Sequence, residues 1–369
     1  MTGTLLDGTL FDGIGSRMVE TDRYRANVLE RAGRDTVPAD TVPADTVPAD
    51  TVPVVFVHGN VSSSLFWQPA MLRLPAERRA IAIDLRGFGD SETVDVDATR
   101  GLRDYSDDVA AVLRALGIAS ANLVGWSMGG GVVMQLMLDH NDFVASALLQ
   151  APVSPYGFGA TAGADGRLLT PDAAGCGAGG ANPDFVARLA AGDTSADEQT
   201  SPRSVYRSSY VKPGFESEYE DLWVESMLST KTGEGSYPGN SVASENWPGF
   251  APGDKGVLNT MAPTVFDTSG IVDLKRKPPI TWIHGTDDAI VSDASFFDLN
   301  YLGQLGIIPG WPGADAAPPQ PMVTQTRAVF EAYRAAGGEF TEVTLKNCGH
   351  SPQLERADAF DAALLAHLR

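Results

Sequence analysis

The pentapeptide Gly-Trp-Ser-Met-Gly at residues 125–129 predicts a sharp turn that carries a serine between a strand and a helix. A short, mostly apolar run at 121–124 precedes it, and an apolar stretch at 128–138 that begins with small residues follows it. A Gly-x-Ser-x-Gly turn holds the serine hydroxyl out at the end of a sheet, beside the free backbone N–H groups of the new helix. Glycines are expected at both flanks because a Cβ atom there would collide where strand and helix converge. Ser127 is therefore a candidate nucleophile.

The pattern around this turn predicts an α/β fold. The chain has 369 residues, of which 43% are hydrophobic, and this suits one large α/β domain with an insertion. Apolar runs and helical spacing predict an N-terminal strand pair at 17–20 and 24–31, strands at 54–57, 79–84, 121–124, 144–150, 280–284 and 342–345, and helices at 105–116, 128–138, 322–336 and 357–368. Strands that alternate with helices argue for a mostly parallel central sheet with helices on both faces. We assign residues 1–150 and 278–369 to this core domain.

Three segments interrupt the core pattern. Residues 151–277 are rich in Gly, Pro, Asp and Ser, with helical pieces only at 182–191 and 216–229, and are too long for a loop. We expect them to form an inserted, largely helical or irregular cap. A second insertion spans 292–321. Within 36–53, the sequence Thr-Val-Pro-Ala-Asp occurs three times, and its regular prolines exclude helix and central strand, so we expect a repetitive surface loop.

Charge and composition exclude several classes of protein. With 27 Lys and Arg against 47 Asp and Glu, the formal net charge is −20, which disfavours nucleic acid and anionic membranes as partners. Two cysteines give no disulfide framework, and no Cys/His spacing typical of a metal site is present. The N-terminus lacks a basic region followed by an apolar run, and no apolar span is long enough for a membrane helix. We expect a cytoplasmic protein without a metal.

A serine needs a base to take its proton, most often a histidine held by a carboxylate. The chain has five histidines. His140 ends the serine helix and His367 lies in the terminal helix, while His58 and His284 each precede a glycine at a strand end, where we expect the ring to bond loop backbone. His350 remains, on a loop just past a strand, at the sheet edge where ligands bind in α/β folds.

The carboxylate and the oxyanion donors are expected at neighbouring strand ends. The Gly-x-x-Asp-x-x-Val loop at 285–291 favours Asp288 as the partner of His350, with Asp287 as the fallback. Backbone N–H groups aimed at the developing negative oxygen are expected from Met128 and from Asn60, which follows the strand at 54–57. The Asn60 side chain is also expected to line the pocket.

These motifs together resemble the α/β-hydrolase family. The resemblance covers about 54–149 and 279–368 and rests on His-Gly at 58–59, the turn at 84–91, the Ser127 turn, the Asp288 loop and Gly-His at 349–350, with the triad in that family's chain order. It implies a serine-hydrolase fold with an inserted cap and no metal or cofactor. It does not imply one substrate, because this fold supports many activities.

One part of the sequence resembles a different branch of that family. The His-Gly-Asn sequence at 58–60, followed by Ser-Ser at 63–64 and by Trp67, is similar to haloalkane dehalogenases, where the asparagine side chain helps to hold halide. Those enzymes, like the related epoxide hydrolases, attack with an aspartate and form an ester that water opens. Ser127 would instead form a stable ether, so dehalogenation and epoxide opening are disfavoured and acyl transfer remains.

We therefore predict a serine hydrolase that cleaves a carboxylic ester or lactone through an acyl-enzyme on Ser127. The sequence at 125–130 also resembles small esterases and cofactor-free haloperoxidases, which double as perhydrolases, so that activity stays an alternative. A carbon–carbon bond hydrolase is another, although such enzymes often carry Asn where Trp126 stands. A non-catalytic binding protein on this fold is disfavoured by the complete triad.

The cap is rich in aromatic residues, and an apolar pocket would suit an acyl chain, an aryl ester or a lactone. Trp126, Phe158 and Trp223 are the pocket residues that we expect. We interpret Arg203 and Arg207 as solvated charged residues on a helix, with the binding of a carboxylate by these arginines as the alternative. Cys348 is read as a small buried hydrophobic residue.

Overall fold

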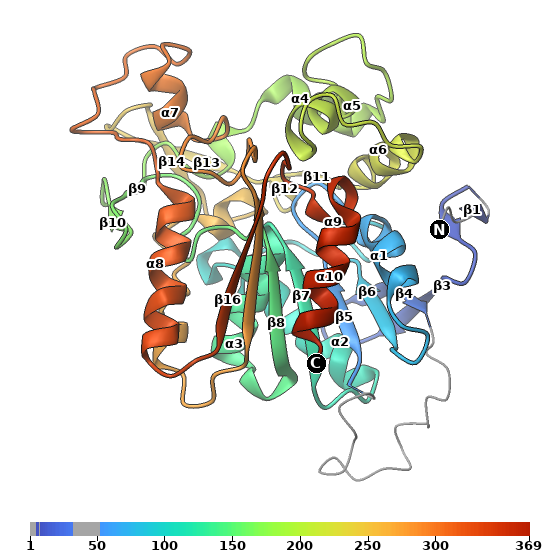
Figure 1. The fold of residues 1–369 in the computed structure, drawn as a ribbon. Helices are drawn as coiled ribbons and strands as arrows, with labels where there is room; N and C mark the ends of the chain where they lie inside the picture. The colour runs from blue at the N-terminus through green and yellow to red at the C-terminus, as the bar shows by residue number, and fades with distance from the viewer. Residues whose placement is uncertain (1–4, 7, 32–51) are drawn as a thin grey trace.

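The computed structural model describes residues 5–6, 8–31 and 52–369, and Figure 1 shows their arrangement. The threefold repeat at 36–50 lies outside the described residues, so the surface loop there stays a prediction.

Within the described residues, one central sheet has eight strands. In spatial order they are β16 (Phe340–Leu345), β15 (Ile280–Gly285), β8 (Val144–Gln150), β7 (Ala121–Trp126), β5 (Val54–Val57), β6 (Ala80–Ile83), β4 (Arg25–Arg31) and β3 (Gly15–Glu20). The strands from β16 to β6 are parallel, whereas β4 and β3 add an antiparallel pair at one edge. The predicted α/β class with a mostly parallel sheet is confirmed.

Burial explains why the parallel strands read as continuous apolar runs. Every residue of β5, β6 and β15 is buried, because helices cover both faces of a parallel sheet. At the edge, five of the six residues of β3 are exposed, as suits a strand with only one neighbour.

Helices pack on both faces of the sheet (Figure 1). On one face α3 (Met128–Asp139) packs against β5, β7 and β8, with α2 (Arg103–Ala115) beside it, and α8 (Met322–Ala335) packs against β16. On the other, α10 (Ala357–His367) packs against β8 and β15, and α1 (Gln68–Arg73) against β4 and β6. The short helix α9 (Pro352–Glu355) links β16 to α10. The remaining short elements of the core are β1 (Leu5–Leu6), β2 (Leu10–Phe11), η4 (Ser64–Trp67), η5 (Ala98–Arg100) and η6 (Asn141–Phe143).

The strand order creates a crevice at one point of the sheet. The chain passes from β5 to β6 on one side and then crosses to β7 on the other. Ligands bind in α/β sheets at the carboxyl ends of strands where the order reverses in this way. His58 follows β5 and Ser127 follows β7, so both lie at this edge.

The segment between β8 and β15 lies over the carboxyl ends of the strands (Figure 1). Its elements are β9 (Thr161–Ala162), β10 (Arg167–Leu168), η7 (Ala178–Gly180), α4 (Pro183–Ala191), α5 (Pro202–Val205), the π-helix η8 (Tyr206–Tyr210), α6 (Glu220–Leu228), β11 (Thr232–Gly233), β12 (Tyr237–Pro238), β13 (Ser241–Ala243), β14 (Phe250–Pro252), η9 (Leu258–Met261) and η10 (Ser269–Asp273). We call residues 151–277 the cap; this division of the chain stays a prediction.

The second insertion at 292–321 packs beside the cap. It contains α7 (Leu299–Gln304), and the indole N–H of Trp247 in the cap donates to the Pro309 carbonyl at 3.0 Å. In the part of the chain that the structure describes, no helix is both long and apolar enough to cross a membrane.

Candidate active site

Ser127 sits in a strained turn between β7 and α3. Its φ of +57° and ψ of −121° are unusual for a residue with a side chain, and such strain is common at functional sites. The Ser127 N–H donates to the Gln150 carbonyl at 2.9 Å, and its carbonyl accepts from Val153 at 3.1 Å and Gly130 at 2.9 Å. The turn is therefore held between the end of β8 and the first turn of α3.

The glycines around Ser127 allow three segments to meet. A Cβ atom on Gly125 would lie 2.5 Å from the Gly129 carbonyl oxygen, and one on Gly129 would overlap the Val57 carbonyl. On the neighbouring loop, a Cβ on Gly59 would lie 3.0 Å from the Ser127 Cβ. The expectation that side chains at the flanks would collide is confirmed.

His350 is oriented by Asp288. Its Nδ1 lies 2.8 Å from Asp288 Oδ2, and both side chains are 1% exposed. The other oxygen, Oδ1, accepts from two backbone N–H groups of the following turn at 2.8 and 3.0 Å. Asp287 points elsewhere: it pairs with Lys212 at 3.1 Å, and its side chain is 41% exposed.

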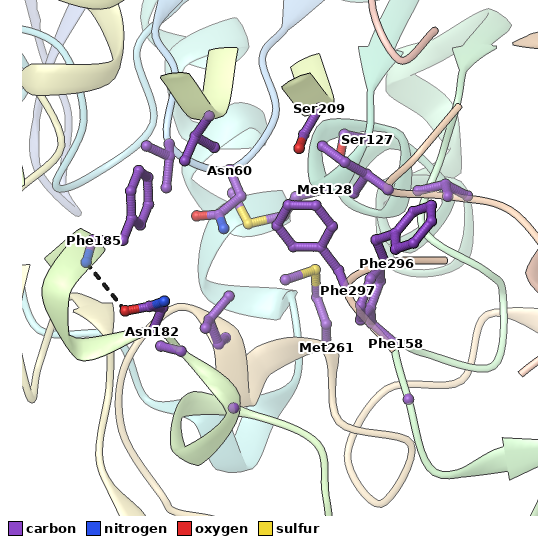
Figure 2. Close-up of a pocket in the computed structure, with 18 of the residues that line it drawn as sticks. Asn60, Ser127, Met128, Phe158, Asn182, Phe185, Ser209, Met261, Phe296 and Phe297 are labelled. Carbon is purple, nitrogen blue, oxygen red and sulfur yellow. Dashed lines mark hydrogen bonds between the residues drawn. The ribbon is translucent and has the colours of Figure 1, made fainter. Parts of the chain in front are cut away.

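One cavity brings the predicted residues together. It has a volume of about 490 Å³, and Ser127, His350, Asn60 and Met128 all line it. Figure 2 shows Ser127, Met128 and Asn60 at its wall. These four residues come from the ends of β5 and β7, the start of α3 and the loop after β16, as the sheet topology requires.

The cavity wall is mainly apolar. Among the described residues that line it, none is Asp, Glu, Lys or Arg. In Figure 2 the aromatic rings of Phe158, Phe296 and Phe297 lie on the side of Ser127, while Phe185 and Asn182 lie on the opposite side. Phe297 is 43% exposed and Phe296 is 53% exposed, so both also reach the surface.

Of the three residues predicted for the pocket, one lines this cavity and the two tryptophans do not. Phe158 lines the cavity, whereas Trp126 and Trp223 are 0% and 1% exposed and lie outside its wall. The Trp126 indole N–H donates to the His350 carbonyl at 2.9 Å, and Trp223 stacks on Phe66 with ring centroids 5.0 Å apart. Both buried indoles have a partner for their N–H group, since that of Trp223 donates to the Ser217 hydroxyl at 2.9 Å.

The second insertion contributes two phenylalanines to the cavity wall that we did not predict from the sequence. Phe296 and Phe297 follow the Asp288 loop directly, and this adjacency was the available signal, because a strand-end loop that carries a triad carboxylate also borders the site.

His58 is structural. Its ring is fully buried, with Nδ1 2.7 Å from the Gly59 carbonyl and Nε2 accepting the Leu85 N–H at 3.0 Å. These partners place the proton on Nδ1, and burial lowers the pKa of His58 below its usual value. The expectation that this ring bonds loop backbone is confirmed.

The other three histidines also have structural partners. His284 Nε2 lies 2.8 Å from Glu342 Oε1. The expectation that this ring bonds loop backbone is therefore wrong, because the neighbouring strand β16 offers a carboxylate within hydrogen-bond distance. His140 Nε2 lies 2.7 Å from an aspartate of α2, and His367 Nδ1 lies 2.9 Å from a threonine of β15.

Two further predictions concern charge and sulfur. Arg203 and Arg207 pair with Glu220, at 2.6 and 2.7 Å, and neither lines the cavity. Cys348 is fully buried, as predicted, and burial raises the pKa of its thiol. Within the described residues, no group of three or more His, Cys, Asp and Glu side chains is placed to hold a metal ion.

Comparison with known proteins agrees with this geometry. A sequence model described as "Alpha/beta hydrolase family" matches residues 54–363, most of the chain. The protein belongs to the alpha/beta hydrolase family. The resemblance predicted from the motifs is confirmed.

Curated relatives of this family member match it over part of their length. A 2-hydroxymuconate semialdehyde hydrolase of Pseudomonas sp. (strain CF600) is 32% identical over 120 residues, which are 32% of this chain and 42% of the relative. The chain spans less than half the length of the first curated relatives that it matches.

Solved structures share the fold of this alpha/beta hydrolase. The carboxylesterase CesB of Bacillus subtilis has a TM-score of 0.56 at 16% identity, over 96% of this chain and 91% of that one. Est816, described as an N-acyl homoserine lactone degrading enzyme, has a TM-score of 0.53 at 18% identity, over 95% and 99%. At these identities the likeness shows the fold alone.

Proposed function

We propose that this alpha/beta hydrolase cleaves a neutral carboxylic ester or lactone through an acyl-enzyme on Ser127. The observation that carries the proposal is the buried Asp288–His350 pair at 2.8 Å, because His350 lines the same cavity as the strained Ser127 turn. A nucleophile, a base and a group that orients the base are the parts that acyl transfer by a serine needs.

In the acylation step, His350 Nε2 takes the Ser127 hydroxyl proton as Oγ bonds to the substrate carbonyl carbon. The backbone N–H groups of Asn60 and Met128 hold the oxygen that becomes negative. The bond from the carbonyl carbon to the leaving oxygen then breaks, and His350 gives its proton to that oxygen. In an ester the alcohol departs; in a lactone it stays on the acyl group.

Water completes the cycle. His350 takes a proton from a water molecule as the water oxygen bonds to the acyl carbon, and it returns the proton to Ser127 Oγ as the acyl–oxygen bond breaks. The product is a carboxylic acid, or a hydroxy acid from a lactone. Asp288 keeps the proton of the imidazole on Nδ1, so Nε2 is free to act as the base.

The uncharged wall of the cavity supports neutral substrates. Buried charges need a partner, and among the described residues the lining offers neither a cation nor a carboxylate. The muconate-derived substrate in the name of the Pseudomonas relative carries a carboxylate. The lining therefore favours an ester or lactone over an anionic substrate of carbon–carbon hydrolysis. We expect a small-molecule substrate and no nucleic acid or membrane partner, and a cytoplasmic location stays a prediction.

The test compares wild type with Ser127→Ala on neutral p-nitrophenyl esters and on lactones of matched chain length. We expect kcat/KM to fall by at least about 10³-fold in the variant, with an unchanged circular dichroism spectrum. Ser209→Ala is the matched control, because Ser209 also lines the cavity (Figure 2) and has no role in the proposed chemistry. Equal turnover by wild type and Ser127→Ala would contradict the proposal.

The same protein preparations separate the alternatives. Peroxide-dependent bromination that exceeds ester turnover would favour a haloperoxidase-like enzyme, and cleavage of a vinylogous diketone without ester turnover would favour a carbon–carbon hydrolase. A fluorophosphonate that fails to label Ser127 would favour a non-catalytic binding protein.

A further inference from the structure

Glu355 holds the backbone on both sides of His350. This residue ends α9, and its Oε2 accepts the Gly349 N–H at 2.8 Å while its Oε1 accepts the Ser351 N–H at 3.1 Å. Gly349 and Ser351 are the two chain neighbours of His350. One carboxylate therefore fixes the peptide groups that flank the proposed base.

The same carboxylate reaches the cap. Glu355 Oε2 also accepts the Lys212 N–H at 2.8 Å, and a Cβ atom on Gly349 would lie only 2.6 Å from that nitrogen. The Ser351 hydroxyl donates to the Tyr210 carbonyl at 2.6 Å. The cap backbone at 210–212 and the His350 loop thus lie against each other, with Glu355 joining them.

The two catalytic loops meet at the same cap residue. The Tyr210 hydroxyl donates to the Asn60 carbonyl at 2.8 Å and lies 3.2 Å from the Val61 carbonyl. Val61 has a φ of +45°, which is rare for a β-branched residue, so this loop is held in a strained form. The loop that carries His350 and the loop that carries Asn60 and Val61 are therefore both hydrogen-bonded to residues 210–212.

Hydrogen bonds from backbone N–H groups to a carboxylate are strong enough to fix the position of the His350 loop. Hydrogen bonds from N–H groups to an ionised carboxylate are shorter and about twice as strong as neutral ones. Burial raises the pKa of Glu355, while the three backbone N–H groups oppose that rise by stabilising its charged form. The carboxylate does not line the cavity among the described residues, so it acts through the His350 loop.

We propose that Glu355 is a positioning residue for the reaction. Its three backbone hydrogen bonds hold His350 in the position relative to Ser127 that proton transfer needs, and they link that position to the cap. Asp288 fixes the rotation of the imidazole ring, and the Trp126 indole fixes the His350 carbonyl. Glu355 supplies the remaining restraint, on the peptide groups before and after the base. This inference rests on the function proposed above.

The experiment measures kcat and KM of Glu355→Ala and Glu355→Gln in the full chain, with the neutral p-nitrophenyl ester that wild type turns over best. A shift of about 1 Å in a catalytic group costs about 10²-fold, so we expect kcat of Glu355→Ala to fall by about that factor while KM changes less than about threefold. Gln keeps one acceptor oxygen, so Glu355→Gln should lie between the alanine variant and wild type.

The matched control is Glu342→Gln. Glu342 is also partly buried and also accepts several hydrogen bonds, from Arg327 and His284, but its hydrogen bonds reach neither the His350 loop nor the cap backbone at 210–212. Its kcat should stay within about twofold of wild type. Thermal unfolding of all variants is measured beside the kinetics.

A structural role alone would lower the melting temperature and leave kcat unchanged well below it, and that result overturns the proposal. A rise in KM at constant kcat overturns it as well, because Glu355 would then shape the cap and not the base. If Glu355→Ala does not fold, Glu355→Gln alone decides by the same criteria. Absence of Ser127-dependent turnover in wild type would instead reject the proposed function, which distinguishes the two failures.

Discussion

Replacing Asp288 by Asn tests the orientation of the base. In the structure, Asp288 Oδ2 faces His350 Nδ1 at 2.8 Å and Oδ1 accepts two backbone N–H groups at 2.8 and 3.0 Å. Asparagine fits this site in one orientation only, with its oxygen toward the two backbone donors. The alternative would place its NH₂ group against those donors and leave them unpaired in a buried site.

The preferred orientation points the asparagine NH₂ at His350 Nδ1. That nitrogen must then accept a hydrogen bond, so the imidazole proton moves to Nε2 and the base cannot take the proton of Ser127. A triad forced into this tautomer loses about 10⁴-fold in kcat. At about 1.4 kcal/mol for each factor of ten, the loss corresponds to about 5 kcal/mol of transition-state stabilisation.

The assay is steady-state ester hydrolysis at neutral pH, with Asp287→Asn as the matched control. Asp287 has the same chemistry one residue earlier, but it pairs with Lys212 near the surface. We expect Asp287→Asn to stay within about threefold of wild type, as is usual for exposed ion pairs.

The opposite pattern would contradict the role of Asp288 as the orienting carboxylate. If Asp287→Asn loses activity while Asp288→Asn keeps it, the carboxylate that orients His350 is that of Asp287. If neither variant changes kcat, neither carboxylate of this loop orients the base.

Three further outcomes follow from other parts of the structure. Tyr210→Phe removes the hydroxyl that bonds the Asn60 carbonyl, so urea unfolding should show a loss of about 1–2 kcal/mol, and a variant as stable as wild type would contradict this. Phe297→Ala opens the cavity beside Ser127, so the ratio of kcat/KM for long to short acyl esters should rise by about tenfold, and an unchanged ratio would remove Phe297 from the substrate wall. Burial lowers the pKa of His367 to about 4. Between pH 6.5 and 4 this histidine is therefore protonated in the unfolded chain but neutral in the folded chain, so the free energy of unfolding should fall as the pH drops from about 6.5 toward 4. His367→Gln should flatten that decline in urea titrations at several pH values, and an equally steep decline would place its cause elsewhere.

The core could be predicted from sequence because its signals are local. Continuous apolar runs such as β5 and β15 reflect burial on both faces, and the glycines around Ser127 reflect backbone contacts that leave no room for a Cβ atom. His350 could be found by elimination, since only one histidine lies on a loop past a strand without a glycine after it.

The pocket wall could not be predicted in the same way. Trp126 adjoins Ser127 in sequence but points into the core, because residues that alternate along a strand face opposite sides of the sheet. Phe296 and Phe297 reach the cavity from an irregular segment, which carries no periodic pattern. One contact of Glu355 joins it to Lys212, 143 positions earlier in the chain, and no local signal marks such a pair.

The most direct test of the central claim is covalent labelling with a fluorophosphonate, followed by intact-protein mass spectrometry and peptide mapping. We expect one adduct per chain, located on Ser127, with ester hydrolysis lost in proportion to labelling and no adduct in Ser127→Ala. Full hydrolytic activity after complete labelling, or equal labelling of Ser127→Ala, would contradict it.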